Sequence, residues 1–392
     1  MTEFIEFTRV HILDLPHDLL LNCLARVSRL YYPTLCLVSK RFRSLITSLE
    51  LYQTRALLGR TESCLYLCSR LSYGSKQCWY TLCKRPTPSP YLTLPKPKPN
   101  HISGWFSPCF RPYRIPKSSN YHMVSVSTRK FSHWTWWTCA AIGSTIYTVG
   151  KYIYGGISSR VFFLDCRSHT WHEAPSIQMT PKYPLMSVID GKIYVVEGLN
   201  VPDSSDSMKV FDLKKQIWEH LPCPRAEIFG KSYILRSLAI DGKLYLFGDK
   251  NMVYKVDENK WDVVGLETRI SWAFSDFSCV IDNIMYNYIL SRKLQWYDSK
   301  GILWRDLKGL EELPKMPKSC TRVRMVNHGG KIALLWDKKV RGFDSNEKNI
   351  WCAVFAVERR SEQEVYGKLE WCEVVLKVPK SCCLLEFLAV DV

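Results

Sequence analysis

No stretch of the 392-residue sequence reaches the roughly 18 uncharged apolar residues that a membrane-spanning helix needs. Its first residues, MTEFIEFT, carry acidic side chains where a secretion signal carries basic ones. The 16 cysteines form no C-x-x-C pair and no regular framework. We therefore expect no membrane span and no export, and reduced thiols in a protein of the cytoplasm or nucleus.

Motifs of catalysis are also missing. The sequence contains no G-x-S-x-G, no Walker loop, no H-E-x-x-H and no dinucleotide fingerprint. Cys64, Cys68, Cys78 and Cys83 are dense enough to suggest zinc, but their spacing departs from that of zinc fingers and favours a packed core. We expect no catalytic residue, no metal and no cofactor.

Acidic residues are absent between Glu62 and Asp165, an interval that holds 13 Lys and Arg in a chain of formal charge +17. Nine prolines fall within residues 84–130, and proline at this density opposes both helices and strand pairing. We expect a basic, proline-rich insertion there. Its charge has two interpretations: a patch for an acidic partner or a nucleic acid, and a solvated loop that lacks acids.

Aromatic residues are plentiful. They make up 13% of the chain, with 14 Trp and 21 Tyr, and 46% of all residues are hydrophobic. This composition is typical of many short packed strands. One large closed β architecture would account for most of the length.

The first fifty residues show helical periodicity. Pro16 suits a first helical position, and apolar residues then recur at helical spacing as far as Val27. Pro33 begins a second segment, and Ser39 can cap a third. Since fifty residues bury only a small core, these three short helices either pack on the rest of the chain or offer an apolar surface to a partner.

The run LPHDLLLNCLARVSRLYYPTLCLVSKRFRSLI closely resembles an F-box over about residues 11–52. Its Leu-Pro start, paired leucines, Leu-x-x-Val-Ser-Lys segment and Phe-Arg-Ser-Leu-Ile ending carry the resemblance together. The resemblance implies that residues 1–60, an F-box with a short helical linker, bind the Skp-type adaptor of a cullin–RING ubiquitin ligase. The adaptor-binding residues that it implies, some of which must form the internal core, are Leu15, Pro16, Leu19, Leu20, Leu24, Leu35, Val38, Phe42 and Ile46.

Five β-hairpins are predicted in the remainder of the chain. Asp190-Gly191 and Asp241-Gly242 each separate two apolar runs and supply the positive φ values of a type I′ turn. Gly143-Ser144, Asp282-Asn283 and Gly329-Gly330 repeat the arrangement at roughly regular intervals.

An Asp that ends an apolar run, with a Trp four or six residues later, follows each of the first four hairpins. The pairs are Asp165 and Trp171, Asp212 and Trp218, Asp257 and Trp261, and Asp298 and Trp304. Successive Trp residues are 47, 43 and 43 positions apart, a period that suits four strands per unit. The units resemble degenerate kelch repeats, in which a double glycine remains only at Gly155-Gly156.

Six such units are expected over residues 61–392, and residues 384–390 are expected to add a strand to the first unit and close the ring. The predicted fold is mainly β: a degenerate kelch-type β-propeller of about six blades with a small N-terminal α-helical F-box. This combination resembles the plant-type F-box/kelch-repeat protein family along nearly the whole chain.

Alternating strand directions place the 2–3 and 4–1 connections of the blades on one face, and loops on a rigid scaffold commonly bind partners. The candidate target-binding residues in the 4–1 connections are Lys182, Arg225, Arg269, Trp272 and Arg322. A ring of such cations would suit an acidic or phosphorylated segment. The alternative is that they are solvated loop cations or tie neighbouring blades together.

What the family resemblance implies is a non-catalytic substrate-recognition subunit of an SCF-type (Skp–cullin–F-box) E3 ubiquitin ligase, whose propeller binds an unknown target protein. Two alternatives without a ligase role stay open. One is a propeller with a polar central pocket for a small-molecule ligand. The other, which we favour least, is a nucleic-acid binder whose affinity falls steeply with salt.

Overall fold

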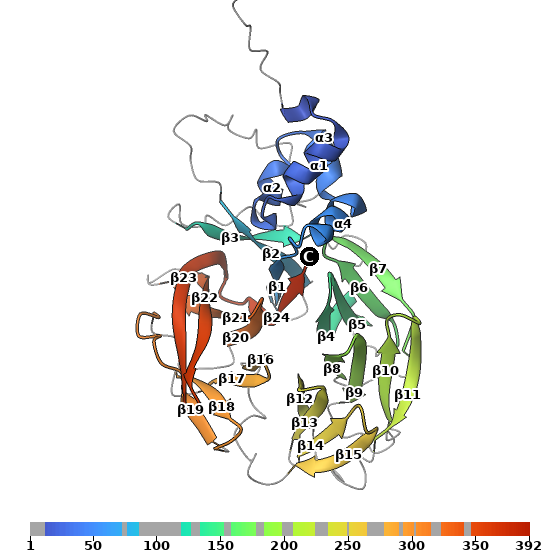
Figure 1. Cartoon of the computed structure of the whole chain (residues 1–392), viewed down its shortest axis with the longest axis vertical. Coiled ribbons are helices and arrows are strands. Elements are labelled where there is room, and N and C mark those ends of the chain that lie inside the picture. Colours follow the sequence, from blue (N-terminus) through green and yellow to red (C-terminus); the bar gives the residue numbers. More distant parts are fainter. Residues whose placement is uncertain are drawn as a thin grey trace, which may run out of the picture.

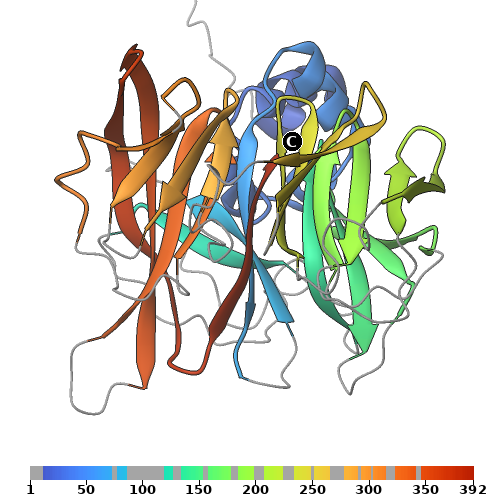
Figure 2. The same ribbon diagram turned by 90° about the horizontal axis from the view of Figure 1, so that it is seen from below.

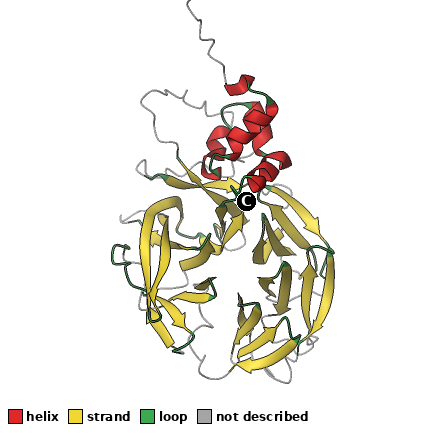
Figure 3. Cartoon of the chain, in the orientation of Figure 1, coloured by secondary structure: helices red, strands yellow, loops and turns green. Residues whose placement is uncertain are grey.

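The computed structural model describes residues 12–72, 77–85, 119–126, 134–152, 158–177, 184–197, 207–223, 234–248, 251–264, 278–289, 293–301, 303–314, 323–340 and 346–392. The helices lie together beside a ring of strands (Figure 1). Figure 3 shows that helices and strands occupy separate parts of the molecule. Within these residues no helix is long and apolar enough to cross a membrane.

The helical unit, residues 12–57, consists of η1 (Ile12–Asp14), α1 (His17–Ala25), η2 (Arg29–Tyr31), α2 (Tyr32–Leu35), α3 (Lys40–Ile46) and α4 (Leu49–Leu57). Ser39 caps α3, as predicted, by accepting a hydrogen bond from the Phe42 N–H at 3.0 Å. Ser48 accepts one from the Leu51 N–H at 3.3 Å and starts a further helix. The three predicted helical segments are therefore four α-helices, because Ser48 divides the last one.

Six four-stranded antiparallel sheets surround a central axis (Figure 1). From the axis outward, blade 1 is β24 (Cys383–Asp391), β1 (Ser63–Arg70), β2 (Gln77–Lys84) and β3 (Tyr121–Val126); blade 2 is β4 (Trp134–Ile142), β5 (Thr145–Tyr152), β6 (Val161–Asp165) and β7 (Thr170–Ala174); blade 3 is β8 (Pro184–Ile189), β9 (Lys192–Glu197), β10 (Ser207–Asp212) and β11 (Ile217–Pro222). Blade 4 is β12 (Ile234–Ile240), β13 (Lys243–Gly248), β14 (Asn251–Lys255) and β15 (Lys260–Val264); blade 5 is β16 (Ser278–Ile281), β17 (Ile284–Tyr288), β18 (Leu294–Asp298) and β19 (Leu303–Asp306); blade 6 is β20 (Val323–His328), β21 (Lys331–Lys339), β22 (Glu347–Ser361) and β23 (Glu364–Pro379). The predicted six-bladed propeller with N-terminal helices is confirmed.

The ring closes in blade 1, where the last strand of the chain pairs with the first. β24 runs antiparallel to β1 from Ser63 opposite Asp391 to Arg70 opposite Cys383. Glu62 and Val392 add two reciprocal backbone hydrogen bonds of 2.9 Å each. The expected closing strand is therefore present, and it is the innermost strand of its blade.

All five predicted hairpins form. Asp190 and Gly191 have φ angles of 47° and 74°, and Asp241 and Gly242 have φ angles of 51° and 65°. A type I′ turn requires positive φ at both positions, which Gly adopts freely and Asp tolerates. The Asp-Gly pairs therefore fix the register of the two inner strands of these blades.

The repeated Asp caps the turn between the third and fourth strands. Asp212 Oδ1 accepts the N–H groups of Lys214 at 2.9 Å and Lys215 at 3.1 Å. Asp165 and Asp298 accept backbone N–H groups of their own turns in the same way. An acceptor at this position satisfies turn N–H groups that the sheet leaves unpaired.

Blade 4 departs from this pattern. There the third strand ends at Lys255, and Asp257 lies within the turn. The Lys255 ammonium lies 2.8 Å from the carboxylate of Asp262 on the next strand. This difference accounts for the shorter interval between Asp257 and Trp261.

The repeated Trp ties one blade to the next. Trp218 Nε1 of blade 3 donates to the carbonyl oxygen of Pro175, just beyond blade 2, at 2.8 Å. Trp261 Nε1 of blade 4 donates to the carbonyl oxygen of Pro222 in blade 3 at 3.0 Å. Trp218 and Trp261 thus each contact the blade that precedes their own.

The expected insertion at about residues 84–130 is shorter than predicted at its C-terminal end. Residues 121–126 form β3, which pairs with β2 from Trp79 opposite Val126 to Lys84 opposite Tyr121. This hexapeptide, YHMVSV, contains no proline and is rich in strand-forming side chains. Residues 86–118, which hold the nine prolines, lie outside the described residues.

Candidate functional site

Exposed apolar side chains concentrate on the helical unit. Of the nine large apolar side chains that the described part of the chain exposes, six belong to it, each between 48% and 88% exposed. We call these six the exposed apolar set: Ile12, Leu19, Leu37, Val38, Leu49 and Leu57. Exposed apolar side chains on a small helical unit are candidates for burial by a partner.

Only some of the nine predicted adaptor-binding residues are accessible. Pro16, Leu19 and Val38 are exposed, Leu15 and Leu35 are half-buried against the core, and Leu20, Leu24, Phe42 and Ile46 are buried. The last four side chains lie in the hydrophobic core of the helical unit, and adaptor binding by the other five stays a prediction. The four buried side chains belong to the alternative that the sequence left open, the internal core.

Four exposed residues escaped the sequence analysis, namely Ile12, Leu37, Leu49 and Leu57. A signal for two of them was present. Leu49 and Leu57 are eight residues apart, so they share one face of α4, and the buried Leu51 lies on another. The sequence analysis did not predict that a helix begins after Ser48, and this boundary decides which side chains of α4 share a face.

The predicted target-binding residues cannot be placed. Lys182, Arg225, Arg269, Trp272 and Arg322 all lie outside the described residues. Their role therefore stays a prediction.

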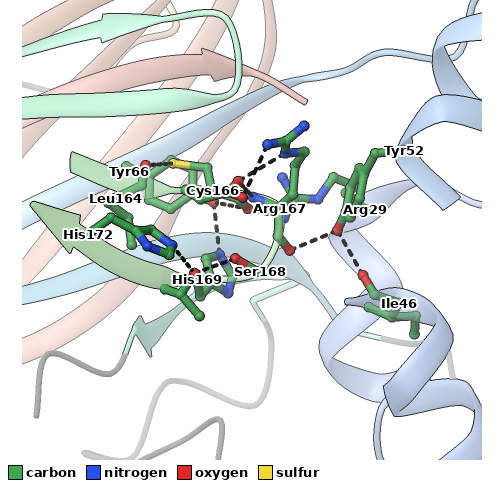
Figure 4. A network of polar contacts seen from close by, with 12 residues as sticks. Arg29, Ile46, Tyr52, Tyr66, Leu164, Cys166, Arg167, Ser168, His169 and His172 are labelled. Atoms are coloured by element: carbon green, nitrogen blue, oxygen red, sulfur yellow. Dashed lines mark hydrogen bonds and ion pairs between the residues drawn. The ribbon is translucent and has the colours of Figure 1, made fainter. Parts of the chain in front are cut away.

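A polar network joins the helical unit to blade 2 (Figure 4). The hydroxyl oxygen of Tyr52 on α4 lies 3.0 Å from the carbonyl oxygens of both Ile46 and Arg167. Arg29 of η2 donates through Nη2 to the carbonyl oxygen of Cys166 at 2.7 Å. Cys166 and Arg167 belong to the β6–β7 turn. Two elements of the helical unit, η2 and α4, therefore form hydrogen bonds with one turn of the propeller.

Burial sets the protonation of this network. Burial raises the pKa of Tyr52 to about 12, so its hydroxyl remains a proton donor. Burial, aided by the positive charge of Arg29, lowers the pKa of His169 to about 3. The neutral His169 ring lies 2.8 Å from the hydroxyl of Tyr66 on β1, which links blade 1 to the same turn.

Arg55 binds the segment that connects α4 with the first strand, β1. Its side chain is buried and donates to the carbonyl oxygens of Val27 at 2.7 Å, Ala25 at 3.1 Å and Arg60 at 2.6 Å. It also pairs with the Glu62 carboxylate at 3.1 Å. Buried charges are stable when they are paired and hydrogen-bonded in this way.

The two parts of the molecule share a hydrophobic core. One cluster of buried residues extends from Leu24 and Ile46 in the helical unit through Tyr66 and Trp79 in blade 1 to Phe162 in blade 2. Figure 2 shows the helices against the strands of these blades, toward one end of the propeller axis. The helical unit is therefore fixed in orientation relative to the propeller.

Among the described residues, no group of three or more His, Cys, Asp or Glu side chains is arranged to hold a metal ion. Cys64, Cys68 and Cys83 are buried in the core, and burial raises the pKa of each thiol. These cysteines act here as small core side chains.

Comparison with known proteins agrees with this architecture. A family model described as an F-box domain matches residues 12–54, and one described as FKB95, Kelch-repeats domain, matches residues 79–376. Two F-box/kelch-repeat proteins of Arabidopsis thaliana are 56% and 55% identical to the chain, each covering 96% of it and 97% and 96% of their own lengths. A third from the same plant is 42% identical over 94% of the chain and 91% of its own length. The chain therefore belongs to the F-box/kelch-repeat protein family of plants.

Proposed function

We propose that this protein is the substrate-recognition subunit of an SCF-type E3 ubiquitin ligase. Its F-box binds a Skp-type adaptor and, through it, a cullin–RING ligase, while its propeller binds the protein to be ubiquitinated. The observation that carries the proposal is the exposed apolar set. These side chains are excluded from the core of the F-box and from its contact with the propeller, so they are available to a partner.

In this role the chain contributes by holding the target protein near the ubiquitin-conjugating enzyme. Binding a target beside a charged ubiquitin-conjugating enzyme raises the effective concentration of the reacting groups, so the receptor needs no reacting group of its own. The shared core and the polar network at the β6–β7 turn support this role. They hold the propeller at a fixed angle to the adaptor-binding surface.

For the target we propose the propeller face that carries the 4–1 connections. The F-box packs on the β6–β7 turn, which is a 3–4 turn and so lies at the other end of the blades. The strand ends that the 4–1 connections join therefore lie at the end of the blades opposite the β6–β7 turn. Their cations, predicted from sequence, would suit an acidic or phosphorylated target segment.

Co-purification with a Skp-type adaptor tests the proposal. The double variant Leu19→Asp/Val38→Asp places charges in the exposed apolar set without altering the core. Ile217→Asp/Val263→Asp is the matched control, because both residues are exposed apolar side chains on the outer strands of blades 3 and 4. We expect the wild-type protein and the control to bind the adaptor at micromolar concentration and the first variant to lose binding.

Each outcome decides a separate point. No complex with the wild-type protein would remove the ligase role. A complex that survives the Leu19/Val38 change would place the adaptor on another surface of the F-box. Addition of cullin–RING to the purified complex, followed by detection of ubiquitin on co-purified proteins, then tests the activity itself.

We also propose that the protein works in the cytoplasm or nucleus. The 14 cysteines among the described residues are all free thiols, which suits a reducing compartment. Imaging of a fluorescent fusion in plant cells checks this. A fusion confined to the secretory pathway would contradict it.

A further inference from the structure

A small cavity lies at the junction between the F-box and the propeller. Its volume is about 30 Å³, and its lining comes from η2, α2, α3 and α4 of the F-box and from β1, β2, β3 and the β6–β7 turn of the propeller. It has room for about one or two species of the size of water. Among the described residues that line it there is no Asp or Glu, and Arg29 is the single Lys or Arg. These residues therefore give the cavity one positive charge and no negative one.

Arg29, which belongs to the polar network of Figure 4, is buried against uncharged groups. It is 9% exposed. Its Nη2 donates to the carbonyl oxygen of Cys166 at 2.7 Å, and its Nη1 donates to the sulfur of Cys64 at 3.7 Å. Its guanidinium carbon lies 5.4 Å from the centre of the Tyr52 ring. Burial raises the pKa of the Cys64 thiol, which therefore carries no charge. Since a guanidinium group stays protonated in proteins, these contacts orient the charge of Arg29 without neutralising it.

The carboxylates of the junction are paired with other arginines. Glu62 Oε1 lies 3.1 Å from Nη2 of Arg55, and Glu62 Oε2 accepts the backbone N–H of Arg29 at 3.0 Å. Asp165 Oδ1 lies 3.0 Å from Nε of Arg167. In the described part of the chain, no ion pair joins the Arg29 guanidinium to a carboxylate. Arg55 and Arg167 thus have counter-charges, and Arg29 has none among the same residues.

A buried charge without a counter-charge is unfavourable, because the interior of a protein solvates it less well than water does. An anion in the cavity would supply the missing charge, whereas water carries none. The size of the cavity selects the anion. Room for about one or two water-sized species admits a monatomic ion and excludes phosphate and larger organic acids.

We propose that this cavity binds one chloride ion against the guanidinium group of Arg29. Because the lining comes from both the F-box and the propeller, the ion contacts both parts and stabilises their docking. The unfolded chain has no such cavity, so chloride shifts the equilibrium toward the folded protein. The proposal does not depend on the ligase role, and neither fails with the other.

A chloride titration of the full chain tests the proposal. Urea unfolding is measured at constant ionic strength while sodium chloride replaces sodium gluconate, whose anion is too large for the cavity. Above the Kd of the ion, the equilibrium constant of unfolding should fall about tenfold for each tenfold rise in chloride, as binding at one site requires. An unfolding constant that does not respond to chloride would overturn the proposal and leave water as the occupant.

Variants locate the site. Arg29→Met removes the charge, and its unfolding constant should be independent of chloride. Arg160→Met is the matched control, because Arg160 is half-exposed in blade 2 and is paired with Glu173; it should keep the full chloride dependence of the wild-type protein. A chloride dependence that persists in Arg29→Met would place the ion elsewhere and refute the site.

Cys83→Leu changes the volume of the cavity and keeps Arg29. Cys83 is buried and lines the cavity, so the larger side chain occupies the space of the ion and should also abolish the chloride dependence. Retained dependence in this variant would contradict the proposal.

The wild-type protein gives an answer that does not depend on the folding of any variant. Crystals grown in sodium bromide should show one anomalous scattering peak beside the guanidinium group of Arg29, since bromide is also monatomic. A bromide crystal without a peak in this cavity would refute the proposal.

Discussion

The hydroxyl oxygen of Tyr52, on the last F-box helix, lies 3.0 Å from the carbonyl oxygen of Arg167 in the β6–β7 turn of blade 2. The same hydroxyl lies 3.0 Å from the carbonyl oxygen of Ile46, at the end of α3. One side chain thus joins two F-box helices and a turn of the propeller that is 115 positions away in sequence. The orientation of the F-box is set by such contacts over a shared core.

Tyr52→Phe should loosen this junction while leaving its packing unchanged. The substitution removes one hydroxyl and leaves a buried carbonyl without its donor, so we expect a loss of about 1–3 kcal/mol in the free energy of unfolding. Hydrogen exchange should rise in α4 and in the β6–β7 turn. Chemical unfolding and exchange mass spectrometry measure the two effects.

Tyr31→Phe is the control for this prediction, since Tyr31 is half-buried in the neighbouring element η2. It should change neither quantity by a comparable amount. Equal exchange in both variants would show that the apolar core alone fixes the F-box.

Arg55→Met should destabilise the protein far more than loss of a surface ion pair. Arg55 is 1% exposed and binds three carbonyl oxygens as well as Glu62. Breaking a buried pair leaves Glu62 and the carbonyl oxygens without their partner, at a cost of about 3–5 kcal/mol. Arg160→Met, which breaks a half-exposed pair with Glu173, should cost about 1 kcal/mol or less. Urea unfolding of both variants compares them, and similar losses would contradict the role of Arg55.

Acid should destabilise the junction through His169. Its folded-state pKa, lowered to about 3, lies below the ordinary value of 6.5, so between these values the unfolded chain binds the additional proton. The contribution of His169 to the free energy of unfolding is therefore fully present above about pH 6.5. It falls by about 1.4 kcal/mol per pH unit as the pH drops toward 3. Unfolding measured from pH 7 to 5 shows the slope.

His169→Asn should flatten that slope. His169 has a φ of 56°, a conformation that Asn adopts readily, and Asn does not titrate. His172→Asn is the control, because His172 lies on the adjacent strand and is exposed. A slope unchanged by His169→Asn would assign the acid sensitivity to other groups.

Local sequence signals predicted the blades well, because their determinants are local. An Asp-Gly pair fixes its own turn through positive φ, and Asp212 caps a turn two and three residues away. The division of F-box residues between core and surface was harder to predict. Phe42 and Val38 both fit the F-box pattern, yet one is buried and the other exposed, because burial depends on how the F-box helices pack against one another.

Long-range contacts left little trace in the sequence. Nothing near Tyr52 or Arg29 indicates a partner in the β6–β7 turn, since that contact depends on the placement of blade 2.

Removal of β24 should abolish the folded ring. A chain that ends at Pro379 loses the strand that pairs with β1 over its whole length, together with the Glu62–Val392 hydrogen bonds. It also loses buried side chains such as Leu384, Phe387 and Val390, each contributing roughly 1.5–3 kcal/mol. That sum approaches the whole stability of a typical domain, about 5–15 kcal/mol. Circular dichroism should show no cooperative melting of the truncated chain, whereas Cys383→Ser, an exposed change in the same strand, should melt like the wild-type protein. Cooperative melting of the truncated chain at an unchanged temperature would mean that blade 1 holds without its innermost strand, and that closure by the C-terminal strand does not stabilise the ring.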